Sequence, residues 1–301
     1  MNRYYKMNET LDKHLQDKKP EMKPPTRKQY VSALIGLYRY ANPDKELVIS
    51  WFDKRDEVDK AIDEKTKSHH SKRNYYSALV CLTDDSHYKD KMNEGNRLIS
   101  SISAKNQRSE TQEENWKSYE DVKALVEKYK KQTKALLSPT SGQLTDKQLV
   151  ELSDFILLAL SSGYYIPPRR SADWVNFRIH NVNKSEHNYL QGSKLVFNKY
   201  KTAKTYGKQE VEIPRELLTI LKNYIKKNPH DYLLVNNKGE PLSQVVITQR
   251  LNKIFGSKIS TSMLRHIYIT HNYEGVDVAK LKRIADEMGH DIETAMDYVV
   301  R

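Results

Sequence analysis

Residues 188–213 read NYLQGSKLVFNKYKTAKTYGKQEVEI, and this stretch decides the fold class because strand signals replace helical ones here. A Gly-Ser pair separates 188–191 from 194–200, which is typical of a hairpin with a tight turn. Residues 208–213 then alternate polar and apolar side chains. The stretch predicts a small three-stranded antiparallel sheet.

Helical patterns lie on both sides of this sheet. Upstream, Ser118 and Thr145 precede apolar residues at helical spacing, and Gln148 completes a capping-box signature with Thr145. Downstream, four helical segments follow, and Gly289 stands at the end of the fourth. Residues 115–301 are therefore expected to form one domain of helices around the sheet.

The N-terminal part reads as helical throughout. Thr26 is a candidate N-cap for one amphipathic helix, and a second helix is expected to begin near Ser71. Residues 1–102 are predicted to form a small helical bundle, and the polar stretch 103–114 is predicted to be a linker. The predicted fold class is mainly α (α+β), with two domains.

Composition points to a polyanionic partner. The 301 residues include 51 Lys and Arg against 39 Asp and Glu, a formal net charge of +12, and both halves of the chain are basic. The single Cys81 excludes an internal disulfide and a multi-cysteine zinc site. No apolar run approaches a membrane span, and no signal peptide is evident, so we expect an intracellular protein of the cytoplasm or nucleus, not secreted.

Common catalytic motifs are missing from the sequence. There is no glycine-rich phosphate loop, His-Glu-x-x-His, Gly-x-Ser-x-Gly or paired-cysteine motif, which argues against ATP and metal chemistry. What remains is a series of basic residues and one tyrosine. In chain order these are Arg170, the lysines of the hairpin, Arg265, His290 and Tyr298.

The order and local contexts of these residues form four boxes. They are Pro168-Arg-Arg-Ser-Ala-Asp173, Tyr200-Lys-Thr202, Met263-Leu-Arg-His266, and Met288-Gly-His290 followed by Tyr298. In them the chain resembles the catalytic domain of the tyrosine recombinases, the phage-integrase family of DNA breaking-and-joining enzymes. The resemblance covers residues 165–301. The N-terminal half resembles the family's core-binding domain in size and helix content only, and the Lys- and Asn-rich style resembles integrases of large DNA viruses or eukaryotic mobile elements.

The resemblance implies a site-specific recombinase that cleaves and rejoins double-stranded DNA. Tyr298 would form a covalent 3′-phosphotyrosine intermediate that stores the bond energy, so neither ATP, a metal nor another cofactor is needed. Members of the family work as homo-tetramers on two DNA sites. We accordingly expect DNA as the partner, with no membrane and no small-molecule substrate.

The chemistry of phosphoryl transfer gives a separate reason to single out the two arginines. A pentacoordinate phosphate gathers negative charge, and guanidinium groups stay ionised and present a planar fork to phosphate oxygens. Arg170 and Arg265 suit this task. Pro167-Pro168 fits the first turn of a helix that would carry Arg170, whose N-terminus would also favour an anion.

The remaining roles follow from the resemblance. A hairpin lysine is the family's usual general acid for the leaving 5′-oxygen; Lys201 is assigned to it, with Lys204 as the alternative. His290 would hydrogen-bond the phosphate or assist the tyrosine, or would only end a helix. DNA contacts are expected from Lys72, Arg73 and Arg169.

Three departures from the family pattern stand out. Ser262 occupies the position where the family commonly has a histidine three residues before the arginine, and it would replace that histidine only in part. His266 points about 100° further around the helix than Arg265 and is not expected to substitute. The interval from His290 to Tyr298 is one residue shorter than the commonest spacing. Three residues follow Tyr298, so either the sequence is shortened or assembly uses a surface other than a C-terminal helix.

Three rival hypotheses remain at this stage. The first is a non-catalytic or weakly active DNA-binding relative, motivated by Ser262 and the short interval. The second is a type IB topoisomerase or telomere resolvase, which shares the chemistry without pairing two duplexes. The third is an RNA-binding helical protein in which the motifs coincide by chance.

Overall fold

The computed structural model describes residues 3–103, 107–273, 278–296 and 298–299. The chain forms two compact units, Met1–Lys105 and Asn106–Arg301. The fold is mainly α with one small sheet, which confirms the predicted fold class. Within the described ranges, no helix combines the length and apolar character needed to cross a membrane.

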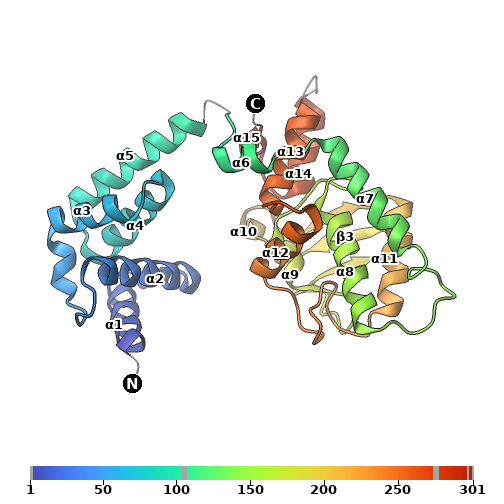
Figure 1. Ribbon diagram of the computed structural model, residues 1–301, viewed down its shortest axis with the longest axis horizontal. Helices are drawn as coiled ribbons and strands as arrows, with labels where there is room; N and C mark the ends of the chain where they lie inside the picture. The colour runs from blue at the N-terminus through green and yellow to red at the C-terminus, as the bar shows by residue number, and fades with distance from the viewer. Residues whose placement is uncertain (1–2, 104–106, 274–277, 297, 300–301) are drawn as a thin grey trace. The chain divides into compact units, whose positions relative to one another are not determined.

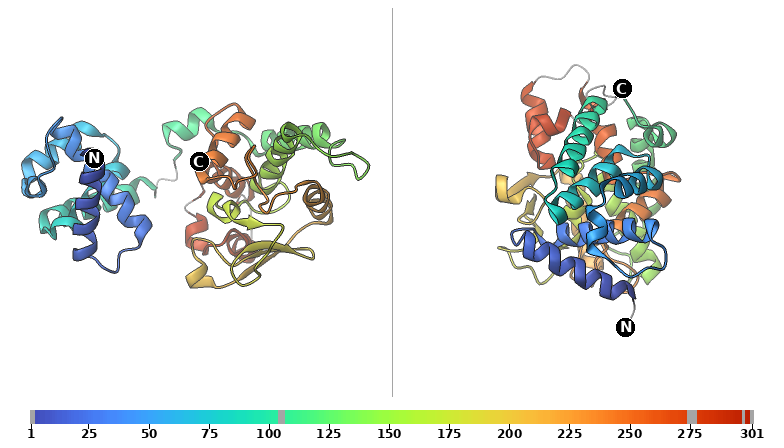
Figure 2. Two further views of the ribbon diagram at one scale, coloured as in Figure 1. Left: turned by 90° about the horizontal axis from the view of Figure 1, so that it is seen from below. Right: turned by 90° about the vertical axis from the view of Figure 1, so that its left-hand side faces the viewer.

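The described part of the N-terminal unit consists of helices (blue to cyan in Figure 2). Its elements are α1 (Arg3–Lys18), α2 (Pro24–Ala41), the 3₁₀ helix η1 (Ile49–Asp53), α3 (Arg55–Lys65), α4 (His69–Thr83) and α5 (Ser86–Ser103). The predicted helical bundle included this region without bounds for a separate helix; in α1, Met7, Leu11 and Leu15 form an apolar stripe that packs into the core of this unit.

Two predicted helix starts are corrected. Thr26 lies inside α2, which begins with Pro24-Pro25 directly after Lys23. The N-cap of α4 is Ser68, whose side chain accepts the backbone N–H of Ser71. In both helices a start signal lies close before the residue chosen from the sequence.

Part of the predicted linker is helical. α5 continues to Ser103, and α6 (Glu110–Asn115) forms inside the stretch that was expected to lack structure. Six residues are too few for a periodic apolar pattern, and the helix is instead held by a capping box between Ser109 and Gln112. Asn115 anchors its end by accepting the backbone N–H of Lys258 at 2.7 Å.

The C-terminal unit surrounds its sheet with helices (Figure 1). Its helices are α7 (Tyr119–Thr133), α8 (Asp146–Ser161), α9 (Ser171–Val175), α10 (Ala203–Tyr206), α11 (Arg215–Lys227), α12 (Gln244–Phe255), α13 (Thr261–Tyr273), α14 (Val278–Met288) and α15 (Ile292–Met296). The helix starts predicted at Ser118 and Thr145 are confirmed in α7 and α8: the predicted capping box of Thr145 with Gln148 is present, and Ser118 also forms one with Asp121. α8 contacts α7, α11 and α12, and its residues 155–161 are completely buried, so it is the centre of the core.

The sheet has four strands in the order β1-β2-β3-β4, where three antiparallel strands were predicted. β2 (Asn188–Gln191), β3 (Lys194–Phe197) and β4 (Gln209–Glu212) are antiparallel as expected. β1 (Phe177–Arg178) adds a parallel strand beside β2. Two residues cannot show alternation, so no periodic pattern predicted this strand.

Asn188 joins the sheet to the segment that carries the candidate site. Its buried amide donates to the carbonyl oxygens of Asp173 (2.9 Å) and Lys199 (2.7 Å). Its Oδ1 accepts the backbone N–H groups of Asn198 (2.9 Å) and Lys199 (2.8 Å). One side chain thus fixes both the end of α9 and the start of the loop that contains the two candidate lysines.

Replacing Asn188 with Ala is expected to lower the unfolding free energy by about 2–3 kcal/mol, because buried backbone groups lose their partners. Chemical denaturation of the isolated protein measures this loss. Asn223→Ala, at a half-exposed position of α11, is the control and should change stability by less than about 0.5 kcal/mol. Equal effects of the two substitutions would show that the Asn188 contacts contribute nothing specific.

Candidate active site

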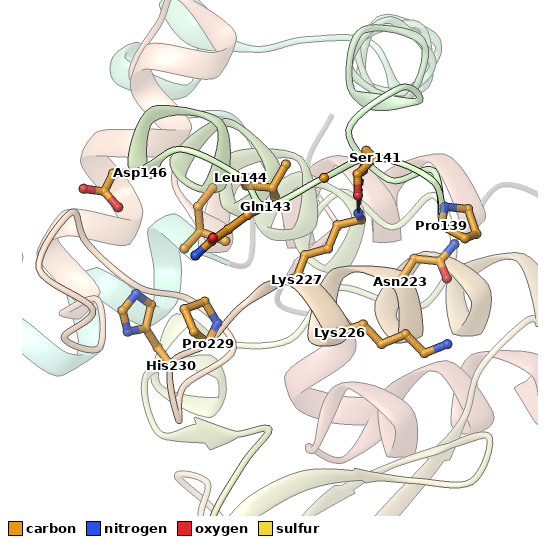
Figure 3. A pocket seen from close by; sticks show the side chains of 12 residues that line it. Pro139, Ser141, Gln143, Leu144, Asp146, Asn223, Lys226, Lys227, Pro229 and His230 are labelled. Atoms are coloured by element: carbon orange, nitrogen blue, oxygen red, sulfur yellow. Dashed lines mark hydrogen bonds between the residues drawn. The ribbon is translucent and has the colours of Figure 1, made fainter.

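A cavity of about 610 Å³ between residues 139–149 and 223–230 contains none of the residues singled out by sequence analysis (Figure 3). Lys227 closes one side by donating to the carbonyl oxygen of Ser141 at 3.0 Å. The candidate active-site residues lie elsewhere, around the first half of α13, which carries Arg265, and the turn between α14 and α15.

Arg265 and Tyr298 are in direct contact. The guanidinium carbon of Arg265 lies 4.0 Å from the centre of the Tyr298 ring, a cation–π geometry. The arginine is 2% exposed, and its Nε and Nη2 have no hydrogen-bond partner among the residues that the structure describes. Burial lowers the pKa of Arg265 to about 10, so the group still carries its charge at neutral pH. Two buried donors are thus left ready for an anionic acceptor.

His290 lies in the turn between α14 and α15 and contacts the same tyrosine. Its ring is stacked on the Tyr298 ring with centroids 5.5 Å apart and planes 29° apart. The imidazole is 2% exposed, and its Nδ1–H donates to the carbonyl oxygen of Asp291 at 3.1 Å. Burial, aided by the charges of Arg265 and Arg170, lowers its pKa to about 4. His290 is therefore neutral at physiological pH, and its partnerless Nε2 carries a lone pair.

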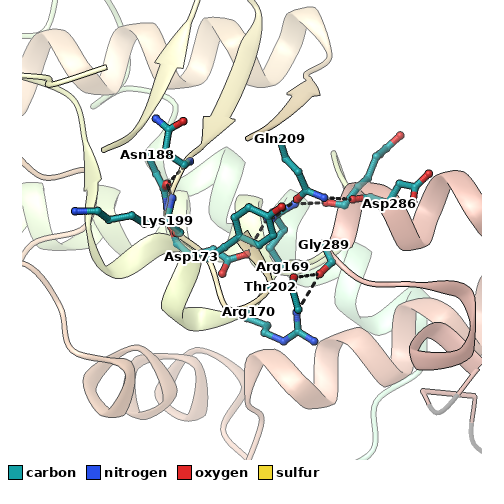
Figure 4. A network of polar contacts seen from close by, with 12 residues as sticks. Arg169, Arg170, Asp173, Asn188, Lys199, Thr202, Gln209, Asp286 and Gly289 are labelled. Carbon is teal, nitrogen blue, oxygen red and sulfur yellow. Dashed lines mark hydrogen bonds and ion pairs between the residues drawn. The ribbon is translucent and has the colours of Figure 1, made fainter. Parts of the chain in front are cut away.

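Arg170 directly precedes α9 and contacts the turn that carries His290 (Figure 4). Its Nη1 donates to the carbonyl oxygen of Gly289 at 3.4 Å. The predicted helix starting at Pro167-Pro168 is wrong: α9 begins at Ser171, and Arg170 precedes it in extended conformation. A proline pair also suits an extended segment, and the five-residue helix that follows gives no basis for a helix-dipole contribution.

The two candidate general acids lie on the segment between β3 and β4. Lys201 lies in a turn and Lys204 lies in α10, and both side chains are exposed. Thr202 Oγ1 donates to the carbonyl oxygen of Gly289 at 2.7 Å, and the Tyr206 hydroxyl donates to Asp291 at 3.3 Å. These contacts hold the segment against the turn that carries His290, and they leave the choice between the lysines open.

Ser262 and His266 lie on α13 with Arg265. Ser262 is exposed in the first turn of the helix, one turn before Arg265. His266, which was not expected to take part, contacts Tyr298 twice: the ring centroids are 4.8 Å apart, and Nδ1–H donates to the Tyr298 carbonyl oxygen at 2.9 Å. No pattern in the sequence predicted that the segment carrying Tyr298 lies against His266.

Arg169 requires a correction, because it was expected to contact DNA. Its guanidinium is completely buried. Nε pairs with Asp173 (2.9 Å), Nη1 donates to the carbonyl oxygen of Glu287 (2.5 Å), and Nη2 donates to Gln209 Oε1 (3.0 Å). The group also lies 4.0 Å from the centre of the Phe197 ring. No part of it is accessible to a duplex, so a basic residue next to a motif arginine was read wrongly as a surface charge.

The predicted DNA contacts of the N-terminal unit lie on α4. Lys72 forms an ion pair with Asp63, and Arg73 is exposed and donates from Nε to Asn96 at 3.0 Å. Their positions allow contact with a partner at this helix. Across the described ranges of both units, no group of three or more His, Cys, Asp or Glu side chains is arranged to hold a metal ion.

No protein-family model and no curated protein sequence matches the chain. Solved structures do resemble it. A lambda integrase (75–356) dimer bound to a COC′ core site has a TM-score of 0.51 at 15% identity, covering 98% of this chain and 94% of that one. A second lambda integrase dimer bound to a COC′ core site has a TM-score of 0.51 at 13% identity, covering 98% and 76%, and the XerA recombinase has a TM-score of 0.40 at 15% identity, covering 98% and 94%.

The chain has the fold of a tyrosine recombinase, which confirms the fold that the four sequence boxes implied. At these identities the likeness concerns the fold. The roles of the individual side chains depend on the geometry described above.

The lowered pKa of His290 predicts an unusual titration. Unfolded His290 takes up its proton near pH 6.5, whereas the folded imidazole resists protonation until about pH 4. Its contribution to stability is therefore complete above pH 6.5 and declines as the pH falls from 6.5 towards 4.

NMR of the imidazole C–H resonances across this range measures the effect, and His290→Gln assigns the signal among the ten histidines. One resonance should remain that of a neutral ring at pH 5.5 and be missing from the variant. If the missing resonance instead titrates near 6.5, His290 is not buried as described.

Proposed function

We propose that this protein is a site-specific DNA recombinase that cleaves and rejoins duplex DNA through a 3′-phosphotyrosine at Tyr298. One observation carries the proposal: two partnerless buried nitrogens of Arg265 and the bare Nε2 of His290 adjoin the Tyr298 ring. This arrangement combines a nucleophile, a proton acceptor and cationic donors for a phosphate. The tyrosine-recombinase fold supports the same conclusion.

The tautomer of His290 suggests a specific role for it. Because Nδ1–H is held by Asp291, the neutral ring can accept a proton only at Nε2. We assign to His290 the proton that the Tyr298 hydroxyl loses as its oxygen attacks phosphorus. Arg265 and Arg170 neutralise the charge that develops on the non-bridging oxygens, and the exposed hydroxyl of Ser262 adds one neutral hydrogen bond.

The bond between phosphorus and the 5′-oxygen breaks as the tyrosyl bond forms. The leaving oxygen takes its proton from Lys201, or from Lys204 in the alternative assignment. Attack by a DNA 5′-hydroxyl on the phosphotyrosine reverses these steps and restores the tyrosine. No external energy source, metal or cofactor takes part in this scheme.

The proposed partner is double-stranded DNA. The net charge of +12 and the exposed Arg73 and neighbouring Lys72 of the N-terminal unit support contacts from both units. The similar lambda integrase structures hold a dimer on a COC′ core site. For this chain we propose assembly into a tetramer on two DNA sites; an origin in a large DNA virus or mobile element is part of the same hypothesis.

Tyr298→Phe is expected to abolish the covalent adduct while DNA binding changes less than about twofold, because only the attacking oxygen is lost. Incubation with nicked duplexes, which trap the intermediate, followed by denaturing electrophoresis measures the adduct. Tyr75→Phe in the N-terminal unit is the matched control and should react like the wild type.

The outcomes also separate the rival hypotheses. A wild type that binds duplex DNA without any adduct would be the non-catalytic relative, with Ser262 as the first suspect. Relaxation of supercoils without recombinant products would favour a topoisomerase or resolvase, and preference for RNA in competition would contradict the DNA assignment. An adduct that persists in Tyr298→Phe would move the nucleophile elsewhere, with Tyr273 the next candidate.

The general acid can be identified with a 5′-phosphorothiolate substrate, whose sulfur leaves without a proton. Lys201→Ala should slow cleavage of the ordinary substrate by about 100-fold or more and cleave the sulfur substrate at close to the wild-type rate. Single-turnover rates for both substrates provide the comparison, with Lys204→Ala as the parallel variant. Rescue confined to Lys204→Ala would assign the acid to Lys204.

A further inference from the structure

We propose that Arg169 is a positioning residue of this site: it connects α9, β4 and the end of α14, and so sets where His290 lies relative to Arg170 and the lysine segment. This inference rests on the proposed function for its catalytic readout. It also makes a claim about His290 that can be measured without any reaction.

The three hydrogen bonds of Arg169 go to three different parts of the unit. Asp173 lies in α9 and Gln209 begins β4 (Figure 4). Glu287 lies in the last turn of α14. Gln209 extends the network, because its Nε2 donates to the carbonyl oxygen of Asp286 at 3.2 Å. The last turn of α14 is thus bound to the sheet by two neighbouring carbonyl groups.

Burying the Arg169 guanidinium costs free energy, so its presence is better explained by the geometry that it imposes than by stability. A completely buried guanidinium loses its hydration, and well-packed apolar side chains often replace buried ion pairs without loss of stability. What an apolar residue could not do is bond three elements at fixed angles, for which the planar fork of arginine is suited. The network therefore fits a role in orientation better than one in stability.

Gly289 shows how closely the catalytic turn fits this network. Its φ is +78°, and a Cβ at this position would lie 2.8 Å from Arg169 Nη2 and 3.3 Å from Gln209 Oε1. The carbonyl oxygen of the same glycine accepts from Arg170 and from Thr202. The next residue in the chain is His290. A shift of the Arg169 network would therefore move the turn, the phosphate-binding arginine and the lysine segment relative to one another.

Loss of this positioning should affect the chemical step and leave DNA affinity nearly intact, because Arg169 itself is inaccessible to DNA. Arg169→Lys keeps a charge for Asp173 but cannot reach three partners, and we expect single-turnover adduct formation at saturating DNA to fall by about 100-fold. Gln209→Met leaves the Arg169–Asp173 pair intact and should lower the rate by about 10-fold. Dissociation constants for DNA should change less than about threefold in both.

Arg178 provides a matched control within the same unit. It pairs with Asp231 at 2.8 Å and lies 3.9 Å from the centre of the Tyr232 ring, so it resembles Arg169 in its contacts but bonds no part of the site. Arg178→Lys should retain the wild-type rate and affinity. Thermal unfolding of all variants ensures that rates are compared on folded protein.

The titration of His290 gives the second readout. In Gln209→Met its pKa should rise from about 4 towards 6.5 as the turn loosens and the imidazole gains access to water, whereas Arg178→Lys should leave it unchanged. If wild type forms no adduct, the proposed recombinase activity fails, and this titration alone decides the positioning role. An unchanged His290 titration, or rates within twofold of wild type in both Arg169→Lys and Gln209→Met, would overturn the inference.

Discussion

The buried guanidinium of Arg265 is the constraint on which the site depends. A charge taken out of water normally needs hydrogen-bond acceptors, and leaving buried donors unmet costs on the order of 1–3 kcal/mol or more per group. Here the π face of Tyr298 provides part of the compensation, and Nε and Nη2 stay without partners. An anion beside Tyr298 would therefore find two buried N–H donors of Arg265 ready to bind it.

In the proposed function, the two arginines stabilise negative charge and His290 accepts a proton. Arg265 and Arg170 remain cationic, and their charges help to keep His290 neutral. A neutral imidazole with its Nδ1–H engaged is a proton acceptor and not a second cation. In the function proposed above, the same charges would bind a phosphate and would keep His290 available as a base beside Tyr298.

The sequence predicted the parts of this protein that have strong local signals. The cap residue Ser118 and the Thr145–Gln148 capping box predicted the starts of α7 and α8, and the Gly-Ser turn predicted the hairpin at the centre of the sheet. β1 was too short to show a pattern. α1 lies within the predicted helical bundle, but its mostly polar sequence did not indicate where the helix begins and ends.

The sequence indicated which residues belong to the candidate site better than it indicated what each of them contacts. Arg170, Arg265, His290 and Tyr298 come together as their order in the chain suggested. No local signal in the sequence distinguishes Arg169 from Arg170, because the burial of Arg169 arises only from the tertiary fold. The contact of His266 with Tyr298 likewise depends on how the last helix returns to α13, which residue spacing does not reveal.

The most direct measurement is a structure of the Tyr298→Phe protein bound to a duplex that the wild type cleaves. We expect a backbone phosphate with oxygens about 2.7–3.2 Å from Nε or Nη2 of Arg265, and with Nε2 of His290 facing the edge of residue 298. A duplex whose phosphates all lie away from these atoms, with water on the Arg265 nitrogens, would contradict the proposal that Arg265 and His290 bind a scissile phosphate.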